Sequence, residues 1–185
     1  SGKEGKDKYG GPGCYGETVA LIGEGSISRK LQELLKPFDL NIMVVSSYLD
    51  KSEISLEEAF EKAYVISSHL PNLDTNKGVL NGDLFKRMRQ TATFINTARG
   101  AQVNHDDLIE VFRERQDLPA LLDVQHPEPP EEGSELYTLP NVYLSSHIAG
   151  SHNDEFVRMA DFMIADFQRW QGGEELLYEV DSEQL

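Results

Sequence analysis

Three side chains that can act together on an anionic substrate, Arg99, Glu128 and His147, each follow a short apolar run. An arginine holds a carboxylate through two parallel hydrogen bonds. A histidine titrates near neutral pH and can supply a proton, and a neighbouring carboxylate favours the protonated imidazole and orients it. These residue types predict acid–base chemistry on a small organic acid. The alternatives are a structural ion pair between Arg99 and Glu128, and a histidine bonded only to backbone.

A glycine-rich loop, Gly23–Ser28, follows the apolar run Thr18–Ile22. Gly23 allows a tight turn, and Gly25 lets the backbone approach a pyrophosphate at the start of a helix. Ser28 is small enough for the third position of this pattern. The loop predicts dinucleotide binding, and the alternative is an ordinary strand–helix turn.

Two residues fit this interpretation poorly. Glu24 places a carboxylate in a loop that should face phosphate. The next apolar run should end in an acid that holds the ribose 2′-hydroxyl, but Ser46 stands there. The nearest cation is Lys51. A preference for NADP and a weakened cofactor site both remain open.

The elements that must position these residues alternate regularly. Buried strands are expected at Thr18–Ile22, Ile42–Val45, Tyr64–Ser68, Ala92–Asn96, Ala120–Val124 and Val142–Ser145. Helices are expected after Gly25, after a cap at Ser55, around Leu84, after a cap at Asn104, and from Phe156 to Trp170. The pattern predicts an α/β fold, a Rossmann-type doubly wound parallel sheet flanked by helices. Ligands of such sheets bind beyond the carboxyl ends of the strands.

The 185 residues fit one ordinary domain with short appendages. We expect a linker or arm over 1–17, a dinucleotide-binding domain over 18–150, and a C-terminal helix and tail over 151–185. The apolar stripe from Phe156 to Trp170 predicts core packing. His126 and His152 are expected at the surface.

Composition excludes several partners. The net charge is −15, which argues against nucleic acid and anionic membranes because both require a basic face. No apolar stretch reaches 18 residues, and the polar start does not resemble a signal peptide. Cys14 is the single cysteine, so the cytoplasm is the expected location, with a reactive thiol as the alternative interpretation of this residue. We expect no metal site.

Three segments carry a family resemblance: INTARG at 95–100, DVQHPEP at 123–129 and HIAG at 147–150. In this order after a glycine loop they resemble the D-isomer-specific 2-hydroxyacid dehydrogenases, from about Tyr15 to about Val180. The resemblance implies NAD or NADP as cofactor, a small 2-keto or 2-hydroxy acid as substrate, and a homodimer. Its catalytic set falls on Arg99, Glu128 and His147. Its cofactor contacts fall on Gly23, Gly25, Ser26, Ile27, Ser46, His69, Leu70, Pro71, Asn76, Thr97, Ala98, Arg99, Asp123, His147 and Gly150.

The sequence also departs from that family. The substrate domain is expected to be largely absent, because only seventeen residues precede Thr18. Gln125 and the pair Ser145–Ser146 replace an aromatic residue and a Thr-Pro pair, and the span between Ser47 and Glu57 is short. We therefore expect cofactor binding with poor turnover. A non-catalytic nucleotide-binding sensor or scaffold on the same fold, or a protein-interaction module, are the alternatives.

Overall fold

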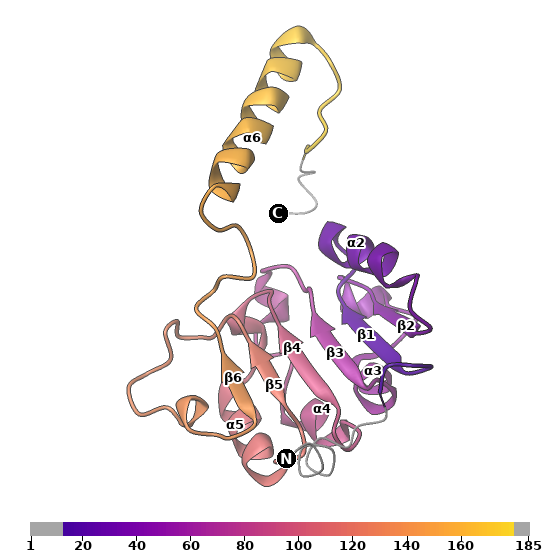
Figure 1. The fold of residues 1–185 in the computed structure, drawn as a ribbon, viewed down its shortest axis with the longest axis vertical. Helices are drawn as coiled ribbons and strands as arrows, with labels where there is room; N and C mark the ends of the chain where they lie inside the picture. Colours follow the sequence, from indigo (N-terminus) through magenta and orange to yellow (C-terminus); the bar gives the residue numbers. More distant parts are fainter. Residues whose placement is uncertain (1–12, 180–185) are drawn as a thin grey trace, which may run out of the picture. The chain divides into compact units, whose positions relative to one another are not determined.

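A computed structural model describes residues 13–179 of the protein (Figure 1). Most of the predicted arm lies outside the described residues. The chain divides into two compact units, Ser1–His147 and Ile148–Leu185. The division therefore falls after His147 rather than after Gly150, and each unit is described below by itself.

The first unit is built on one six-stranded sheet. Its strands are β1 (Thr18–Ile22), β2 (Asn41–Val45), β3 (Val65–Ser68), β4 (Thr93–Asn96), β5 (Ala120–Leu122) and β6 (Val142–Leu144). They lie in the order β2-β1-β3-β4-β5-β6, and every neighbouring pair is parallel. The Rossmann-type fold is confirmed, and all six strands agree with the expected runs to within two residues. The strand order reverses between β1 and β3, where such sheets open a crevice for ligands.

All α-helices of this unit except the first begin after a residue whose side chain caps them. They are α2 (Ser26–Leu35), α3 (Leu56–Lys62), α4 (Gly82–Arg87) and α5 (His105–Glu114). The Ser55 hydroxyl accepts a hydrogen bond from the Glu58 amide, and the Asn104 side chain accepts one from the Asp107 amide. Both predicted caps are confirmed. Each satisfies a backbone N–H that the first helical turn leaves without a partner.

A cluster of phenylalanine rings joins the sheet to α3, α4 and α5. The Phe85 ring lies 5.8 Å from Phe60, 5.1 Å from Phe94 and 5.7 Å from Phe112 between centroids, and all four side chains are fully buried. These edge-on contacts lock one face of the sheet to its helices. Elsewhere on the sheet, Leu121 of β5 and Tyr143 of β6 remain exposed.

The second unit contains one long helix, α6 (Glu155–Gly172). Its buried Asp166 carboxylate accepts hydrogen bonds from the backbone amides of Leu177 and Tyr178, which ties the following tail to the helix. The prediction that the stripe from Phe156 to Trp170 forms core is wrong for the described chain, because these side chains are more than half exposed at both ends of the stripe. A unit with a single helix offers no second apolar layer to cover it. Within residues 13–179, no helix has both the length and the apolar composition that a membrane crossing requires.

The partly buried histidine His105, at the start of α5, predicts a loss of stability in mild acid. Burial lowers its pKa below the ordinary 6.5, the nearby His126 lowers it further, and its Nε2 atom has no hydrogen-bond partner among the described residues. The unfolded chain therefore binds a proton at His105 more readily than the folded chain does. The stability that comes from keeping His105 neutral is complete above pH 6.5 and is lost as the pH falls below it.

We expect the free energy of unfolding, measured by urea titration, to decrease as the pH falls from about 7 toward about 5.5. His105→Gln should flatten this dependence. His152→Gln changes an exposed side chain and should leave the dependence as it is. An unchanged slope in His105→Gln would show that the titration of this histidine does not limit folding.

Candidate active site

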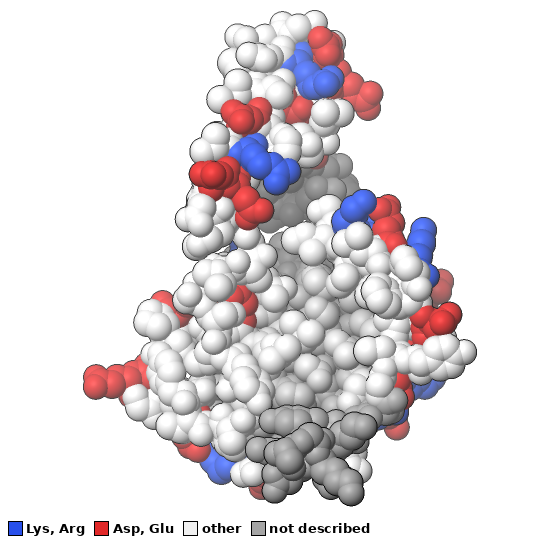
Figure 2. All heavy atoms as spheres, in the orientation of Figure 1, with Lys and Arg blue, Asp and Glu red and all other residues white. Residues whose placement is uncertain are grey.

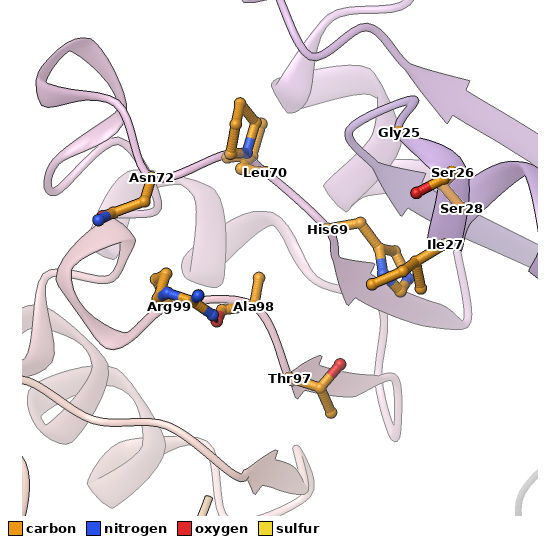
Figure 3. Close-up of a pocket in the computed structure, with 11 residues that line it drawn as sticks. Gly25, Ser26, Ile27, Ser28, His69, Leu70, Asn72, Thr97, Ala98 and Arg99 are labelled. Atoms are coloured by element: carbon orange, nitrogen blue, oxygen red, sulfur yellow. Dashed lines mark hydrogen bonds between the residues drawn. The ribbon is translucent and has the colours of Figure 1, made fainter. Parts of the chain in front are cut away.

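A pocket lies where the segments after β1, β3 and β4 meet, at the reversal of strand order (Figure 3). Its volume is about 230 Å³. In the view of Figure 3, Ile27 and His69 lie toward one end, and Asn72 and Arg99 lie toward the other. The lining residues are Gly25, Ser26, Ile27, Ser28, His69, Leu70, Pro71, Asn72, Thr97, Ala98 and Arg99.

The two glycines of the loop serve different purposes. Gly23 has a φ of +108°, and a Cβ atom there would lie 2.5 Å from the carbonyl oxygen of His69. Glycine is therefore required for β1 and β3 to approach each other at this point. A Cβ on Gly25 would meet nothing within 4 Å, so this position opens onto free space.

The start of α2 fits a phosphate group. Gly25 precedes the helix and provides no side-chain cap, and the first turn holds no acidic residue. The amides of that turn therefore point into the pocket mouth, where the positive end of the helix dipole favours an anion. The Ser28 hydroxyl is fully buried in this turn with no hydrogen-bond partner among the described residues. A dinucleotide pyrophosphate fits this cradle, with the amides of the first turn of α2 as its donors.

His69 lies on the β3 side of the pocket. Its Nε2 atom is 3.0 Å from the Ser67 hydroxyl, and burial lowers its pKa. The ring is therefore neutral near pH 7, so this wall of the pocket carries no charge of its own. The following turn is held by Gln102, whose buried amide donates to the carbonyls of Leu70 at 2.7 Å and Pro71 at 3.1 Å.

The turn that carries Arg99 is organised by Asn96, the last residue of β4. The Asn96 side chain is fully buried, accepts from the Ala98 amide at 3.0 Å and donates to the Arg99 carbonyl at 3.1 Å. The Arg99 guanidinium is exposed, and within the described part of the chain it donates only to the neighbouring Ala98 carbonyl, at 2.7 Å. Among the described residues, no carboxylate forms an ion pair with it, so the structural ion pair between Arg99 and Glu128 is not formed.

Replacing Asn96 by leucine should disturb this turn more than it disturbs the sheet. The two side chains are similar in size, but leucine forms neither of the two buried hydrogen bonds, at a cost of about 1–3 kcal/mol in the free energy of unfolding. We expect urea denaturation to show that loss, and the affinity for NADH to fall as well. Unchanged cofactor affinity in a destabilised variant would contradict a role for Asn96 in shaping the pocket.

His147 and Glu128 are joined by a hydrogen bond at the same end of the sheet. The Nδ1 atom of His147 lies 2.7 Å from the Glu128 carboxylate, and the two side chains are 46% and 38% exposed. Glu128 stands between two prolines, at 127 and 129. The imidazole is thus oriented by a carboxylate rather than by backbone, through its Nδ1 atom. His147 has a φ of +56°, a conformation that non-glycine residues rarely adopt outside functional sites.

Asp123 links the ends of β4, β5 and β6. Its amide donates to the Asn96 carbonyl, its carbonyl accepts from the His147 amide, and both distances are 3.0 Å. Its buried carboxylate accepts from the Ser145 hydroxyl at 2.5 Å. The turn that carries Arg99 also packs closely against the loop after β5. The backbone of Gly100 approaches that of Gln125 so closely that a Cβ atom on Gly100 would lie 2.0 Å from the Gln125 carbonyl carbon. Arg99, Glu128 and His147 are therefore carried by adjoining strand ends.

The predicted cofactor residues fall into two groups. The pocket brings together Gly25, Ser26, Ile27, His69, Leu70, Pro71, Thr97, Ala98 and Arg99. The other residues do not line it, although Gly23 forms its turn. Asn76 is buried and its amide donates to the Pro71 carbonyl, so it supports the turn after His69. Ser46 follows β2, and Gly150 belongs to the second unit.

Two lining residues, Ser28 and Asn72, were not among the predicted contacts. The third position of the glycine pattern pointed to Ser28, although only as a packing residue. No sequence motif indicates Asn72 as a lining residue. It lines the pocket because Gln102, which is distant in the sequence, holds the turn that leads to it. No group of three or more His, Cys, Asp or Glu side chains in the described part of the chain is placed to hold a metal ion.

Charge is distributed unevenly on the visible face of the sheet-bearing unit. In Figure 2, lysine, arginine, aspartate and glutamate side chains of this unit gather near its edges, and few lie over its middle. Arg99 therefore brings a positive charge without a carboxylate partner among the described residues, on a chain of net charge −15.

Comparison with known proteins agrees with this geometry. A putative 2-hydroxyacid dehydrogenase, YoaD, of Bacillus subtilis (strain 168) is 32% identical over 171 residues, covering 89% of this chain and 50% of that protein. The crystal structure of TT0316 protein from Thermus thermophilus is 30% identical with a TM-score of 0.74, covering 90% of this chain and 54% of the other.

A third match concerns the fold alone. A probable 2-hydroxyacid dehydrogenase from Rhizobium etli CFN 42, solved in complex with NADP, HEPES and L(+)-tartaric acid, is 24% identical with a TM-score of 0.80 and covers 100% of this chain and 64% of that one. The chain spans about half the length of YoaD, and of several other curated relatives that it matches. The family model described as "D-isomer specific 2-hydroxyacid dehydrogenase, NAD binding domain" matches residues 1–149. The chain belongs to the D-isomer specific 2-hydroxyacid dehydrogenases and carries their NAD-binding domain.

Proposed function

We propose that this chain is the cofactor-binding part of an NAD(P)-dependent oxidoreductase that interconverts a small 2-keto acid and the D-2-hydroxy acid. The observation that carries the proposal is the His147–Glu128 pair beside an arginine that has no carboxylate partner among the described residues. A cation, a proton donor and its orienting carboxylate at adjoining strand ends fit a substrate that holds a carboxylate next to a carbonyl.

Each residue has a separate task in this mechanism. Arg99 binds the substrate carboxylate and polarises the adjacent carbonyl. His147 gives its Nε2 proton to the carbonyl oxygen as the keto acid is reduced, and takes it back in the reverse direction. Glu128 stabilises the imidazolium through Nδ1 and holds the ring in place. The nicotinamide cofactor, when bound, supplies or accepts the hydride.

The cofactor would be held by the pocket and by the start of α2. The amides after Gly25 receive the pyrophosphate, and Asp123 stands at the strand end next to the acid–base pair. We propose that its carboxylate, which the Ser145 hydroxyl orients, receives the nicotinamide carboxamide. The homodimer expected from the resemblance and the cytoplasmic location expected from the single cysteine belong to the same proposal. Sedimentation of the purified chain at several concentrations tests the dimer.

Calorimetric titration with NADH and NADPH tests the cofactor site, and dinucleotide oxidation in the presence of pyruvate or glyoxylate tests the reaction. Binding accompanied by oxidation with either keto acid supports the proposal. Binding without oxidation by any 2-keto acid favours the alternative of a non-catalytic nucleotide-binding sensor or scaffold. Binding of neither nucleotide would overturn the proposed function.

A further inference from the structure

The residues after β2 form a small polar site that the reaction itself does not use. We propose that this site, formed by Ser46, Ser47, Lys51 and Ser52, receives the 2′-phosphate of NADPH and makes the chain prefer NADPH to NADH. The inference rests on the proposed function, since it concerns the adenosine end of the same cofactor. It assigns a specificity to a family domain that is named for NAD.

The site is positioned beside the pyrophosphate cradle. The Glu24 amide in the glycine loop donates to the Ser47 hydroxyl at 2.8 Å, and the Gly23 amide donates to the Val45 carbonyl at 2.9 Å. These two bonds tie the end of β2 directly to the loop at the start of α2. The adenosine ribose of a dinucleotide bound along such a loop lies at the end of the second strand.

Three hydroxyl groups in this site accept hydrogen bonds from the backbone. Ser46 accepts from the Tyr48 amide at 3.1 Å, Ser52 accepts from the Ser46 amide at 2.9 Å, and Ser47 accepts from Glu24 as described. A hydroxyl has one proton to donate, and an oxygen that accepts from an amide directs that proton elsewhere. Each of the three O–H groups therefore keeps a proton that it can donate to a phosphate, and none of them carries a negative charge that would repel one.

Two cationic side chains belong to the segments that meet here, Lys51 after β2 and Arg29 on α2. The Lys51 ammonium lies 5.2 Å from the centre of the Tyr48 ring, and no carboxylate pairs with it among the described residues. From α2, the Arg29 guanidinium donates to the Glu24 carbonyl at 3.1 Å. A 2′-phosphate carries close to two negative charges and forms charge-assisted hydrogen bonds with such groups.

The acid that recognises NAD is replaced. Val45 is followed by Ser46 and Ser47, so no carboxylate stands where one would accept from the 2′- and 3′-hydroxyls of NAD and repel a phosphate. Three acids stand near these residues, Glu24 through its bonded amide and Asp50 and Glu53 along the chain, and all three are exposed to solvent, which screens their repulsion.

Calorimetric titration of the 185-residue chain with NADPH and NADH tests the inference. We expect NADPH to bind at least about tenfold more tightly at low salt, and 2′,5′-ADP to bind more tightly than 5′-AMP by a similar factor. Lys51→Ala should weaken NADPH binding by about fivefold to tenfold and leave NADH binding unchanged. Glu24→Gln should strengthen NADPH binding, and Ser46→Asp should reverse the preference.

Lys86→Ala on α4 is the matched control for the loss of one positive charge, and it should change neither affinity. All variants change partly or fully exposed side chains, and their thermal unfolding shows whether they fold. NADH binding as tight as NADPH, or an equal effect of Lys51→Ala on both, would overturn this inference while the dinucleotide site stands. Binding of neither nucleotide would overturn the proposed function along with it.

Discussion

Replacing His147 by asparagine is expected to lower the turnover of a 2-keto acid by roughly 10²–10⁴-fold, the usual contribution of one positioned acid–base group. Asparagine cannot donate a titratable proton to the carbonyl oxygen. It does tolerate the positive φ of 56° at this position, so the strand end should keep its shape. Turnover is measured by NADPH or NADH oxidation in a preparation that reduces the keto acid.

Two further variants distinguish the loss of the His147 proton donor from the loss of the Glu128 charge beside its ring. Glu128→Gln keeps a hydrogen-bond acceptor 2.7 Å from Nδ1 but removes the charge, so turnover should fall less than in the histidine variant. His147→Ala removes the proton donor and also suits the positive φ poorly, so it should lose stability as well. Near-normal turnover in His147→Asn, with cofactor affinity retained, would exclude His147 as the proton donor.

Replacing Gly23 by alanine is expected to destabilise the whole unit by about 2–4 kcal/mol. Its φ of +108° is unfavourable for any residue with a Cβ atom, and that atom would lie 2.5 Å from the His69 carbonyl oxygen and 2.9 Å from the Leu70 nitrogen. Both neighbours are backbone atoms, which a rotamer change cannot move away. Urea unfolding followed by circular dichroism should show the loss directly.

Gly25→Ala is the matched comparison in the same loop. The φ of Gly25 is −86°, and a Cβ atom there would meet nothing within 4 Å, so stability should change by less than about 1 kcal/mol. The added methyl group instead occupies the space where a pyrophosphate approaches the start of α2, so cofactor affinity should fall. A loss of stability in Gly25→Ala equal to that in Gly23→Ala would contradict the division of roles between the two glycines.

The sequence determined much of the sheet because its signals are local. Runs such as Thr18–Ile22 are apolar on both faces, as buried parallel strands must be, and they end at residues that break the strand. The caps at Ser55 and Asn104 were predictable because each side chain bonds an amide only three residues ahead. The family segments around Arg99 and His147 were recognisable for a related reason, since each is a short continuous stretch.

The contacts between segments were decided only by the tertiary structure. Nothing local indicates that Glu128 pairs with His147 rather than with Arg99, because that choice depends on which strand ends adjoin. Asn76 was expected at the cofactor, yet it supports a turn through the Pro71 carbonyl. The stripe on α6 illustrates the same point, since apolar spacing shows that a helix has a face to bury and does not show that its unit provides a layer to cover it.

The end of β2 shows most clearly what the sequence determined and what only the tertiary structure decided. From the sequence alone, Ser46 indicated only the loss of an acid, which left NADP preference and weakened binding equally open. The folded chain adds that Ser47 bonds the glycine loop and that the backbone orients the hydroxyls of Ser46 and Ser52. Residue type thus determined which chemistry was possible, because that is a property of single side chains. The direction of each donor was decided by tertiary structure, because it depends on backbone atoms as far as 23 residues away.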